Sequence, residues 1–341
     1  MKRNSLIRDQ IYATLLALLI TVLFVSSAFA KALEIKGFTL TVSDMDKSVA
    51  FFEQALGFSK TTDRTYADRD HDYLTGVFGT RVRSVTLKLG DETIELEKYL
   101  SPAGQPIPVD SRSNDLWFQH FAVVVSDMDK AYAHVSKFAI TGISSAPQTI
   151  PESNKGAAGI KAYKFKDHDG HPLELLYFPP DKGNPKWQQQ NAKLFLGIDH
   201  SAISVSNTER STAFYQDLLG LQVKGGGVNT GATQEQLDNA VGAVVRITGL
   251  RPEKDTGPGL EFLQYVTPSG GRPAPLGTRL NDLAATCVVL EVDDLATLVK
   301  KLQEKNVTFV SPEVVAIGGQ GYSKGLVIKD PDGHAVLLVQ H

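Results

Sequence analysis

The chain has 341 residues, of which 42% are hydrophobic and 21% are charged, so its composition is that of an ordinary globular protein. Its formal net charge of -3 leaves no basic excess, which argues against a nucleic-acid partner. The length suits about two domains. The single cysteine, Cys287, excludes an internal disulfide, and its place in the apolar run CVVL predicts a small, buried strand residue.

The first thirty residues have the organisation of a secretion signal. Lys2, Arg3 and Arg8 form a basic start, residues 11–25 are apolar, and Ala28-Phe29-Ala30 has the small-x-small spacing of a cleavage site. We therefore predict that residues 1–30 are a signal peptide and that the mature protein is exported, either periplasmic or secreted. The alternative is an uncleaved anchor over residues 11–30, which is just long enough to span a bilayer. A membrane is an expected partner only in that case.

Four segments of the chain repeat one pattern, in which an apolar strand leads directly into a helix. They are GFTLTVSDMDKSVAFFEQALGF from Gly37, HFAVVVSDMDKAYAHVSKF from His120, HSAISVSNTERSTAFYQDLLGL from His200 and CVVLEVDDLATLVKKLQ from Cys287. The stretch that precedes His120 returns before Cys287, so the copies also pair at a higher level. The chain is therefore a duplication of a duplication, and internal repetition of this kind outranks other signals for the fold.

The first copy shows how each unit begins. Phe38, Leu40 and Val42 alternate with other residues, as in a strand with one buried face. Ser43 or Asp44 can cap the helix that follows, and a glycine can end it.

The third copy has similar signals for the start and the end of its helix. Ser206 with Glu209 three residues later predicts a capping box, and Gly220 is expected to end the helix.

Further strands follow the helix of each copy, so the predicted unit is βαβββ and the fold class is α+β. These strands are VRSVTLKL and TIELEKY, GIKAYKF and PLELLYF, AVVRITG and LEFLQYV, and GYSKGLVIKD and HAVLLVQ. The turns Asp169-Gly170-His171 and Asp332-Gly333-His334 precede two of the last strands. The proline-rich, polar stretch 181–195 is typical of a linker between two halves.

With these motifs the chain resembles the vicinal oxygen chelate superfamily, which includes glyoxalase I, bleomycin-resistance proteins and extradiol dioxygenases. The resemblance rests on the repeated strand-to-helix start, the Asp-Gly-His turns and the final-strand glutamates, and it covers residues 33–341. It implies two domains of the glyoxalase/bleomycin-resistance/dioxygenase type. The expected domains are residues 33–180, with modules 33–102 and 115–180, and residues 196–341, with modules 196–268 and 281–341.

The resemblance also implies a set of metal ligands. In this superfamily two modules form a cup, and each module supplies one ligand from its first strand and one glutamate from its last strand. The first-strand positions are Gly37, His120, His200 and Cys287, and the last-strand positions are Glu95, Glu174, Glu261 and Leu337. Only modules two and three have both members, and module one keeps only Glu95. The implied ligands are therefore His120, Glu174, His200, Glu261 and Glu95, with Glu174 or Glu261 as the catalytic base.

The strand period supports these assignments without the family. In a strand, alternate side chains face opposite sides, so Glu174 points away from Leu173 and Leu175 if these pack on the helices. The same alternation separates His120 from Phe121 and Val123. Mixed imidazole and carboxylate ligands suit zinc, iron, nickel, cobalt or manganese. We expect a divalent metal and leave its identity open.

The pairing of the modules decides which residues share a site. If the modules pair within each half, Glu95 joins His120 and Glu174 in the first half. If modules two and three pair across the linker, His120, Glu174, His200 and Glu261 form a complete set. This completeness favours the second arrangement, with side-chain ends within roughly 3 to 5 Å of one another.

Three functions agree with these motifs. The leading hypothesis is an exported lyase or isomerase that acts on a small substrate with two neighbouring oxygens through a metal-stabilised enediolate. An extradiol-type dioxygenase is the first alternative, although the triads expected within each half are broken at Gly37, Cys287 and Leu337. The second alternative is a non-catalytic protein that binds a small molecule in a cup without metal.

Other polar residues receive simpler interpretations. His168, His171 and His334 lie in turns, where we expect surface hydrogen bonding. The charged stretch from Arg64 to His71 is expected to be a solvated loop rather than a lid.

Overall fold

The structure is a computed structural model that describes residues 30–189, 192–318 and 321–341. Nearly all of the predicted signal segment lies outside these residues. No helix in the described ranges is both long enough and apolar enough to cross a membrane.

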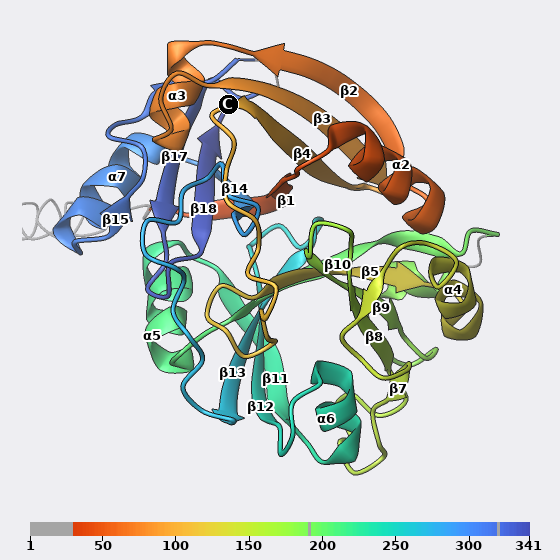
Figure 1. Cartoon of the computed structure of the whole chain (residues 1–341). Helices are drawn as coiled ribbons and strands as arrows, with labels where there is room; N and C mark the ends of the chain where they lie inside the picture. Colours follow the sequence, from red (N-terminus) through yellow and green to blue (C-terminus); the bar gives the residue numbers. More distant parts are fainter. Residues whose placement is uncertain (1–29, 190–191, 319–320) are drawn as a thin grey trace, which may run out of the picture.

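Each of the four repeats folds as a βαβββ module (Figure 1). Module one comprises β1 (Ala32–Thr41), α2 (Met45–Leu56), β2 (Ser59–Tyr66), α3 (Arg69–Thr75), β3 (Arg81–Leu89) and β4 (Glu92–Ser101). Module two comprises β5 (Gln119–Val125), α4 (Met128–Val135), β6 (Thr141–Gly142), β7 (Gln148–Thr149), β8 (Lys161–Lys166) and β9 (Pro172–Tyr177). The short strands β6 and β7 together take the place of one edge strand, because both pair with β8.

The second half repeats this order. Module three comprises β10 (Phe195–Ser204), α5 (Thr208–Thr212), the π-helical turn η2 (Ala213–Leu218), β11 (Gln222–Thr230), α6 (Ala232–Asp238), β12 (Val244–Arg251) and β13 (Gly259–Thr267). Module four comprises β14 (Thr286–Val292), α7 (Leu295–Glu304), β15 (Thr308–Phe309), β16 (Val315–Ala316), β17 (Lys324–Lys329) and β18 (Ala335–Gln340). The stretch between the halves carries a short 3-10 helix, η1 (Pro185–Gln188).

The helix caps lie at one position of the repeat. Asp44 caps α2 by accepting a hydrogen bond from the backbone N–H of Lys47, and Gly57 ends this helix with a left-handed φ of 73°. In module three the predicted cap at Ser206 is wrong, because the side chain of Asn207 accepts the hydrogen bond from Arg210. The backbone N–H of Ser206 instead donates to Asp332 in module four.

The modules pair across the two halves of the sequence. Both sheets have nine strands. Sheet A has the order β15-β17-β18-β14-β1-β4-β3-β2, with β16 also paired to β17, and sheet B has the order β11-β12-β13-β10-β5-β9-β8-β6, with β7 also paired to β8. Sheet A therefore joins modules one and four, and sheet B joins modules two and three. At the two junctions, the antiparallel registers place Thr39 opposite Cys287 and Ala202 opposite His120. Of the two pairings that the sequence allows, the structure has the one across the linker.

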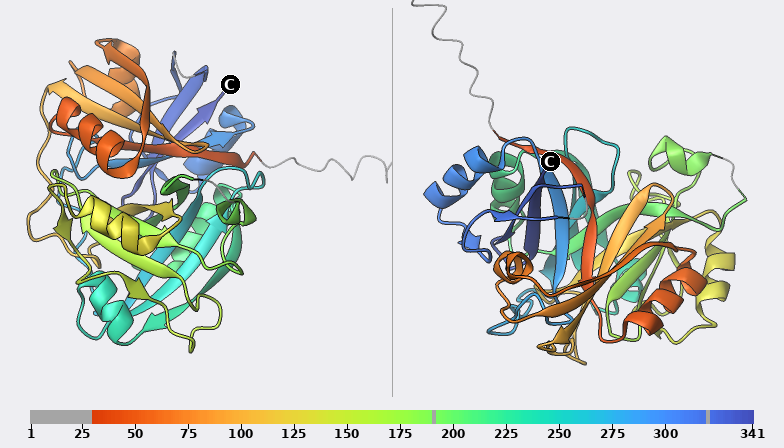
Figure 2. Two further views of the ribbon diagram at one scale, coloured as in Figure 1. Left: turned by 90° about the vertical axis from the view of Figure 1, so that its right-hand side faces the viewer. Right: turned by 90° about the horizontal axis from the view of Figure 1, so that it is seen from above.

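The two sheets form separate layers that share one core (Figure 2). Phe38 of β1 stacks on Phe121 of β5 with ring centroids 6.2 Å apart, and Phe52 of α2 packs on the same ring. Alternation along the strands then turns the other face of each sheet away from this core. Each sheet consequently has its own cup, cup A and cup B, and the short helices α3 and α6 lie over cups A and B respectively (Figure 1).

The Asp-Gly-His turns connect the two sheets and are not surface features. His171 is buried, with its Nδ1 donating to the Asp167 carboxylate at 2.9 Å and its Nε2 donating to the Thr41 carbonyl at 2.9 Å. His334 is also buried, and its Nε2 donates to the Ser204 carbonyl at 2.9 Å. Each turn thus ties the end of one sheet to the first strand of the other. The prediction of surface hydrogen bonding was wrong because a turn viewed in sequence does not show which layer covers it.

We expect His171 to make the stability of the protein depend on pH. Burial alone would lower the pKa of His171, but Asp167 outweighs burial and raises it to about 9. Since the unfolded-state value is about 6.5, this contribution is complete below pH 6.5 and is lost as the pH rises through 9; it amounts to roughly 3 kcal/mol. The free energy of unfolding of the wild type minus that of His171→Gln should therefore shrink between pH 6 and pH 9.5 in urea titrations. An unchanged difference would contradict the charged pair.

Candidate metal centre

Four strands at the centre of sheet B bring four predicted ligand residues into cup B. His120 lies in β5, Glu174 in β9, His200 in β10 and Glu261 in β13. The neighbours of His120 and Glu174 along their strands, such as Phe121 and Leu173, pack into the shared core, so alternation turns the polar side chains into the cup.

The distances between these side chains suit one shared ion. The Nε2 atom of His120 lies 3.4 Å from Oε2 of Glu174, and the Nε2 atom of His200 lies 3.8 Å from the same oxygen. Donor atoms of these three residues all lie within 4.8 Å of one another. Oε2 of Glu261 lies 3.5 Å from Nε2 of His200. The four groups therefore meet, and their role as ligands stays a prediction.

His120 is the clearest sign that a metal belongs here. Its side chain is 2% exposed, and neither ring nitrogen makes a well-aligned hydrogen bond to a described residue, although the Glu174 carboxylate lies 3.4 Å from Nε2. A buried polar group without a partner costs on the order of 1 to 3 kcal/mol. Burial also lowers the pKa of His120, which keeps the ring neutral and its lone pair available. A divalent ion would satisfy this nitrogen, so the residues present fit the group that the family implies.

The charges around His120 prepare the other donors for a cation. Burial alone would raise the pKa of Glu174, but His120, Lys164 and His200 lower it to about 2, so this carboxylate stays ionised. Burial alone would lower the pKa of His200, but the carboxylates of Glu261, Asp199 and Glu174 raise it to about 9. Without metal, these carboxylates stabilise the protonated form of His200. A metal cation that binds His200 would replace this proton and be stabilised by the same carboxylates.

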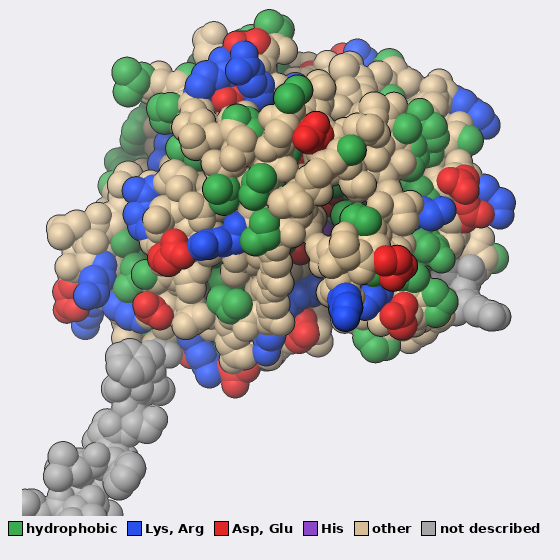
Figure 3. All heavy atoms as spheres, turned by 90° about the horizontal axis from the view of Figure 1, so that it is seen from below, with side chains coloured by type: hydrophobic (Ala, Val, Ile, Leu, Met, Phe, Trp, Pro, Cys, Tyr) green, Lys and Arg blue, Asp and Glu red, His purple; other side chains and the backbone are tan. Residues whose placement is uncertain are grey.

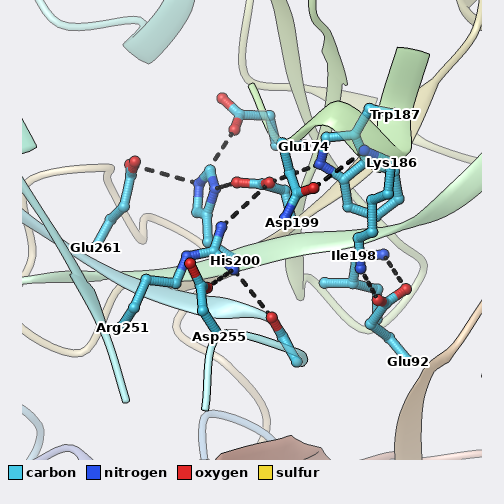
Figure 4. A network of polar contacts seen from close by, with 12 residues as sticks. Glu92, Glu174, Lys186, Trp187, Ile198, Asp199, His200, Arg251, Asp255 and Glu261 are labelled. Atoms are coloured by element: carbon cyan, nitrogen blue, oxygen red, sulfur yellow. Dashed lines mark hydrogen bonds and ion pairs between the residues drawn. The ribbon is translucent and has the colours of Figure 1, made fainter. Parts of the chain in front are cut away.

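Asp199 orients His200 within this site (Figure 4). Its Oδ2 accepts from Nδ1 of His200 at 3.0 Å, which leaves Nε2 facing Glu174 and Glu261. Asp199 is held in turn by Nε1 of Trp187 at 2.9 Å and by Arg251 at 3.3 Å. The linker thus contributes to the site through Trp187, which the sequence analysis missed. The acidic residue directly before His200 was the available signal for Asp199.

Replacing Asp199 with asparagine should weaken metal binding without removing a ligand. The loss of a carboxylate that orients a ligating histidine typically costs 10- to 100-fold in metal affinity. We expect an affinity loss of this size for Asp199→Asn in competition titrations against a chromogenic chelator. An exposed carboxylate offers the control, Asp181→Asn, which should bind metal as the wild type does. An equal affinity in Asp199→Asn would show that His200 needs no such partner.

A lysine also points into cup B, and the sequence analysis did not single it out. Lys164 of β8 lies opposite Glu174 in the register of β8 and β9. Its Nζ atom lies 2.6 Å from Oδ1 of Asp238 at the end of α6, and both side chains are buried. Ser144 also holds α6 over cup B, because its hydroxyl donates to the Leu237 carbonyl at 2.7 Å.

The face of the molecule seen from below is hollowed, and a histidine side chain is visible inside it (Figure 3).

The remaining predicted ligand, Glu95, lies elsewhere. It belongs to β4 of sheet A and accepts a hydrogen bond from Ser84 in cup A. In the described ranges, His120, Glu174 and His200 are the group of three that could hold a metal ion. Glu95 therefore does not join this set, because modules one and two do not share a sheet.

The charged stretch, residues 64–71, is largely exposed, as expected, but it is not a loop over most of its length. It runs from the end of β2 into α3, and His71 is only partly exposed. The expectation of a loop was wrong because a seven-residue helix is too short to show a clear periodicity in a sequence.

Comparison with models of protein families shows the family to which this chain belongs. The model of the Glyoxalase/Bleomycin resistance protein/Dioxygenase superfamily matches residues 34–175 and again residues 197–338. The chain belongs to this superfamily. The superfamily model thus recognises the two halves of the sequence, whereas the two sheets each combine modules from both halves.

Solved structures share the superfamily fold with this chain. Glyoxalase I from Zea mays is 17% identical, with a TM-score of 0.58 over 90% of this chain and 92% of that chain. A Bacillus subtilis protein named as a candidate dioxygenase is 12% identical, with a TM-score of 0.54 over 91% of this chain and 86% of that chain. At these identities the likeness shows the fold alone. No curated protein sequence matches this chain significantly.

Proposed function

We propose that the protein is a divalent-metal-dependent lyase or isomerase that acts on a small substrate with two neighbouring oxygen atoms. The observation that carries the proposal is the buried His120, which makes no well-aligned hydrogen bond to a described residue through its ring nitrogens and faces Glu174 and His200. A metal bound there supplies Lewis-acid polarisation of the two substrate oxygens, which makes the proton on the adjacent carbon easier to remove.

We assign the four residues to two roles, and the distances between them support this assignment. His120, Glu174 and His200 form the compact group and would hold the metal. Glu261 lies at the edge of this group, against His200, and its side chain is 29% exposed compared with 7% for Glu174. Burial and the neighbouring Glu174 raise the pKa of Glu261 above its usual value, although His200 opposes them. Glu261 is therefore the better candidate for the base that moves a proton between adjacent carbons.

A test of the reaction type uses solvent exchange. The full-length chain loaded with zinc, nickel, cobalt or manganese is incubated in D₂O with small α-hydroxycarbonyl compounds such as glycolaldehyde and dihydroxyacetone. We expect deuterium to enter next to the carbonyl, as followed by NMR, and a chelator to stop the exchange. Metal binding without any exchange across such a panel would favour the non-catalytic binding role.

A dioxygenase remains the second candidate because two histidines and one carboxylate, here His120, His200 and Glu174, also suit Fe(II). Glu261 beside His200 ranks the dioxygenase second, because a carboxylate placed as a general base is what a lyase or isomerase needs. Oxygen consumption by the iron-loaded protein with catechol would support the dioxygenase.

We further propose that the protein is exported after cleavage near Ala30. The proposal rests on the order of basic, apolar and small residues at the start of the sequence. Cleavage after Ala30 would leave β1 intact, since this strand begins at Ala32. N-terminal sequencing of exported protein should find Lys31 or Leu33 first, and a membrane-bound product that still begins at Met1 would show an anchor instead.

A further inference from the structure

Cup A contains a cavity that the metal chemistry of cup B does not use. The cavity measures about 240 Å³ and lies between the strands of sheet A and helix α3. Ser311 of module four donates to the Leu74 carbonyl at 2.6 Å, which fixes α3 over the cup. The volume is just below the range of about 300 to 1,000 Å³ that is usual for ligand pockets, which indicates a small ligand.

The floor of cup A lacks the histidine and glutamate ligands that module two supplies to cup B. The register of the sheets places Cys287 and Leu337 where cup B has His120 and Glu174. Burial raises the pKa of the Cys287 thiol to about 12, so it stays neutral. Leu337 and other aliphatic residues, including Val327 and Ile317, line the cavity and offer no ligands. The walls therefore suit the apolar part of an organic molecule.

The polar groups in cup A are mostly acidic. Glu95 and Glu97 come from the same face of β4, and Asp68 and Asp70 come from the start of α3. Among the described residues that line the cavity, none is a lysine or an arginine. His71 is the basic residue of the lining, and its Nε2 lies 3.6 Å from Oε1 of Glu97. Among the lining residues the carboxylates therefore outnumber the one basic group even when His71 is protonated, and Arg64, which is outside the lining, lies over the ring of Tyr66.

Glu97 is positioned to receive a ligand. Its side chain is 16% exposed, and Tyr99 donates to its Oε2 over a long distance of 3.4 Å. The ring of Tyr66 also lines the cavity and stacks on His71 with centroids 5.8 Å apart, so the imidazole covers one face of this ring. A carboxylate at the edge of a cavity is a group that attracts an organic ammonium ion.

We propose that cup A is a second binding site, which takes a small organic cation with an apolar body. The ammonium group pairs with the carboxylate of Glu97, and the body fills the space against Leu337. A bare metal ion fits less well, because one side of the cavity is aliphatic and gives it no ligands. This site is independent of the proposed reaction in cup B.

Binding of benzylamine to the full-length chain tests the proposal, with uncharged benzyl alcohol as the matched probe. Calorimetry should show saturable benzylamine binding and an affinity for benzyl alcohol that is at least about tenfold lower, the ratio expected when one charge-assisted hydrogen bond is lost. Glu97→Gln should reduce the affinity for benzylamine by a similar factor and leave the affinity for benzyl alcohol unchanged. Glu261→Gln, in cup B, should leave both affinities unchanged.

A second variant distinguishes loss of the binding site from misfolding of the protein. Leu337→Phe should fill the cavity and weaken both probes, while circular dichroism and metal binding in cup B report that the fold is intact. Equal affinities for the two probes, no benzylamine binding, or loss of binding in Glu261→Gln rather than Glu97→Gln would each overturn the proposal. Calcium binding that depends on Glu97, without benzylamine binding, would also overturn it.

Discussion

Replacing either His120 or His200 with alanine is expected to remove the same metal ion from the protein. The two residues belong to different halves of the sequence, yet their Nε2 atoms both approach Oε2 of Glu174, at 3.4 and 3.8 Å. Loss of a ligand should cost more than the roughly 10- to 100-fold that follows loss of a residue that only orients one. Elemental analysis after dialysis should find about one divalent ion per wild-type chain and almost none in either variant.

The control for this prediction is another histidine. His341 is 59% exposed and lies at the C-terminus, so His341→Ala should keep the full metal content. Far-ultraviolet circular dichroism should show that all variants are folded. If His120→Ala lost its metal but His200→Ala kept it, the site would not be shared between the two halves.

The second large effect concerns Glu261 and separates catalysis from metal binding. We expect Glu261→Gln to lower the rate of deuterium exchange by about 10²- to 10⁴-fold, which is the usual contribution of a positioned general base. Metal content should remain close to that of the wild type, because Glu261 contacts His200 at the edge of the group. Glu174→Gln should lose metal and activity together, because Glu174 lies within 3.8 Å of both histidines.

The contrast between these two glutamates is the informative result. Equal metal loss in both variants would mean that Glu261 is an ordinary ligand. Retained exchange in Glu261→Gln, with metal bound, would transfer the role of base to another residue.

Much of the architecture could be predicted from the sequence because the strand-to-helix start is repeated four times. The two-residue period of a strand turns His120 away from Phe121 and Glu174 away from Leu173, so packing these apolar neighbours in the core places both polar side chains in a cup. The choice between the two pairings could be favoured only by counting which modules keep both ligands. Strand patterns do not decide it, since the first strand of every module can pair with the first strand of any other.

Other parts of the site depend on packing between distant segments. Trp187 reaches Asp199 from the linker, and Lys164 meets Asp238 from a helix in another module. Neither contact leaves a local pattern in the sequence. The burial of His171 likewise depends on β1 of the opposite sheet covering its turn.

The most direct test of the account is anomalous diffraction from a crystal of the full-length chain, recorded at the absorption edge of the bound metal. We expect a single strong peak in cup B, about 2.0 to 2.2 Å from nitrogen atoms of both His120 and His200. A peak in cup A beside Glu95, or a protein that binds no metal when divalent ions are supplied, would contradict a metal centre shared by the two halves of the chain.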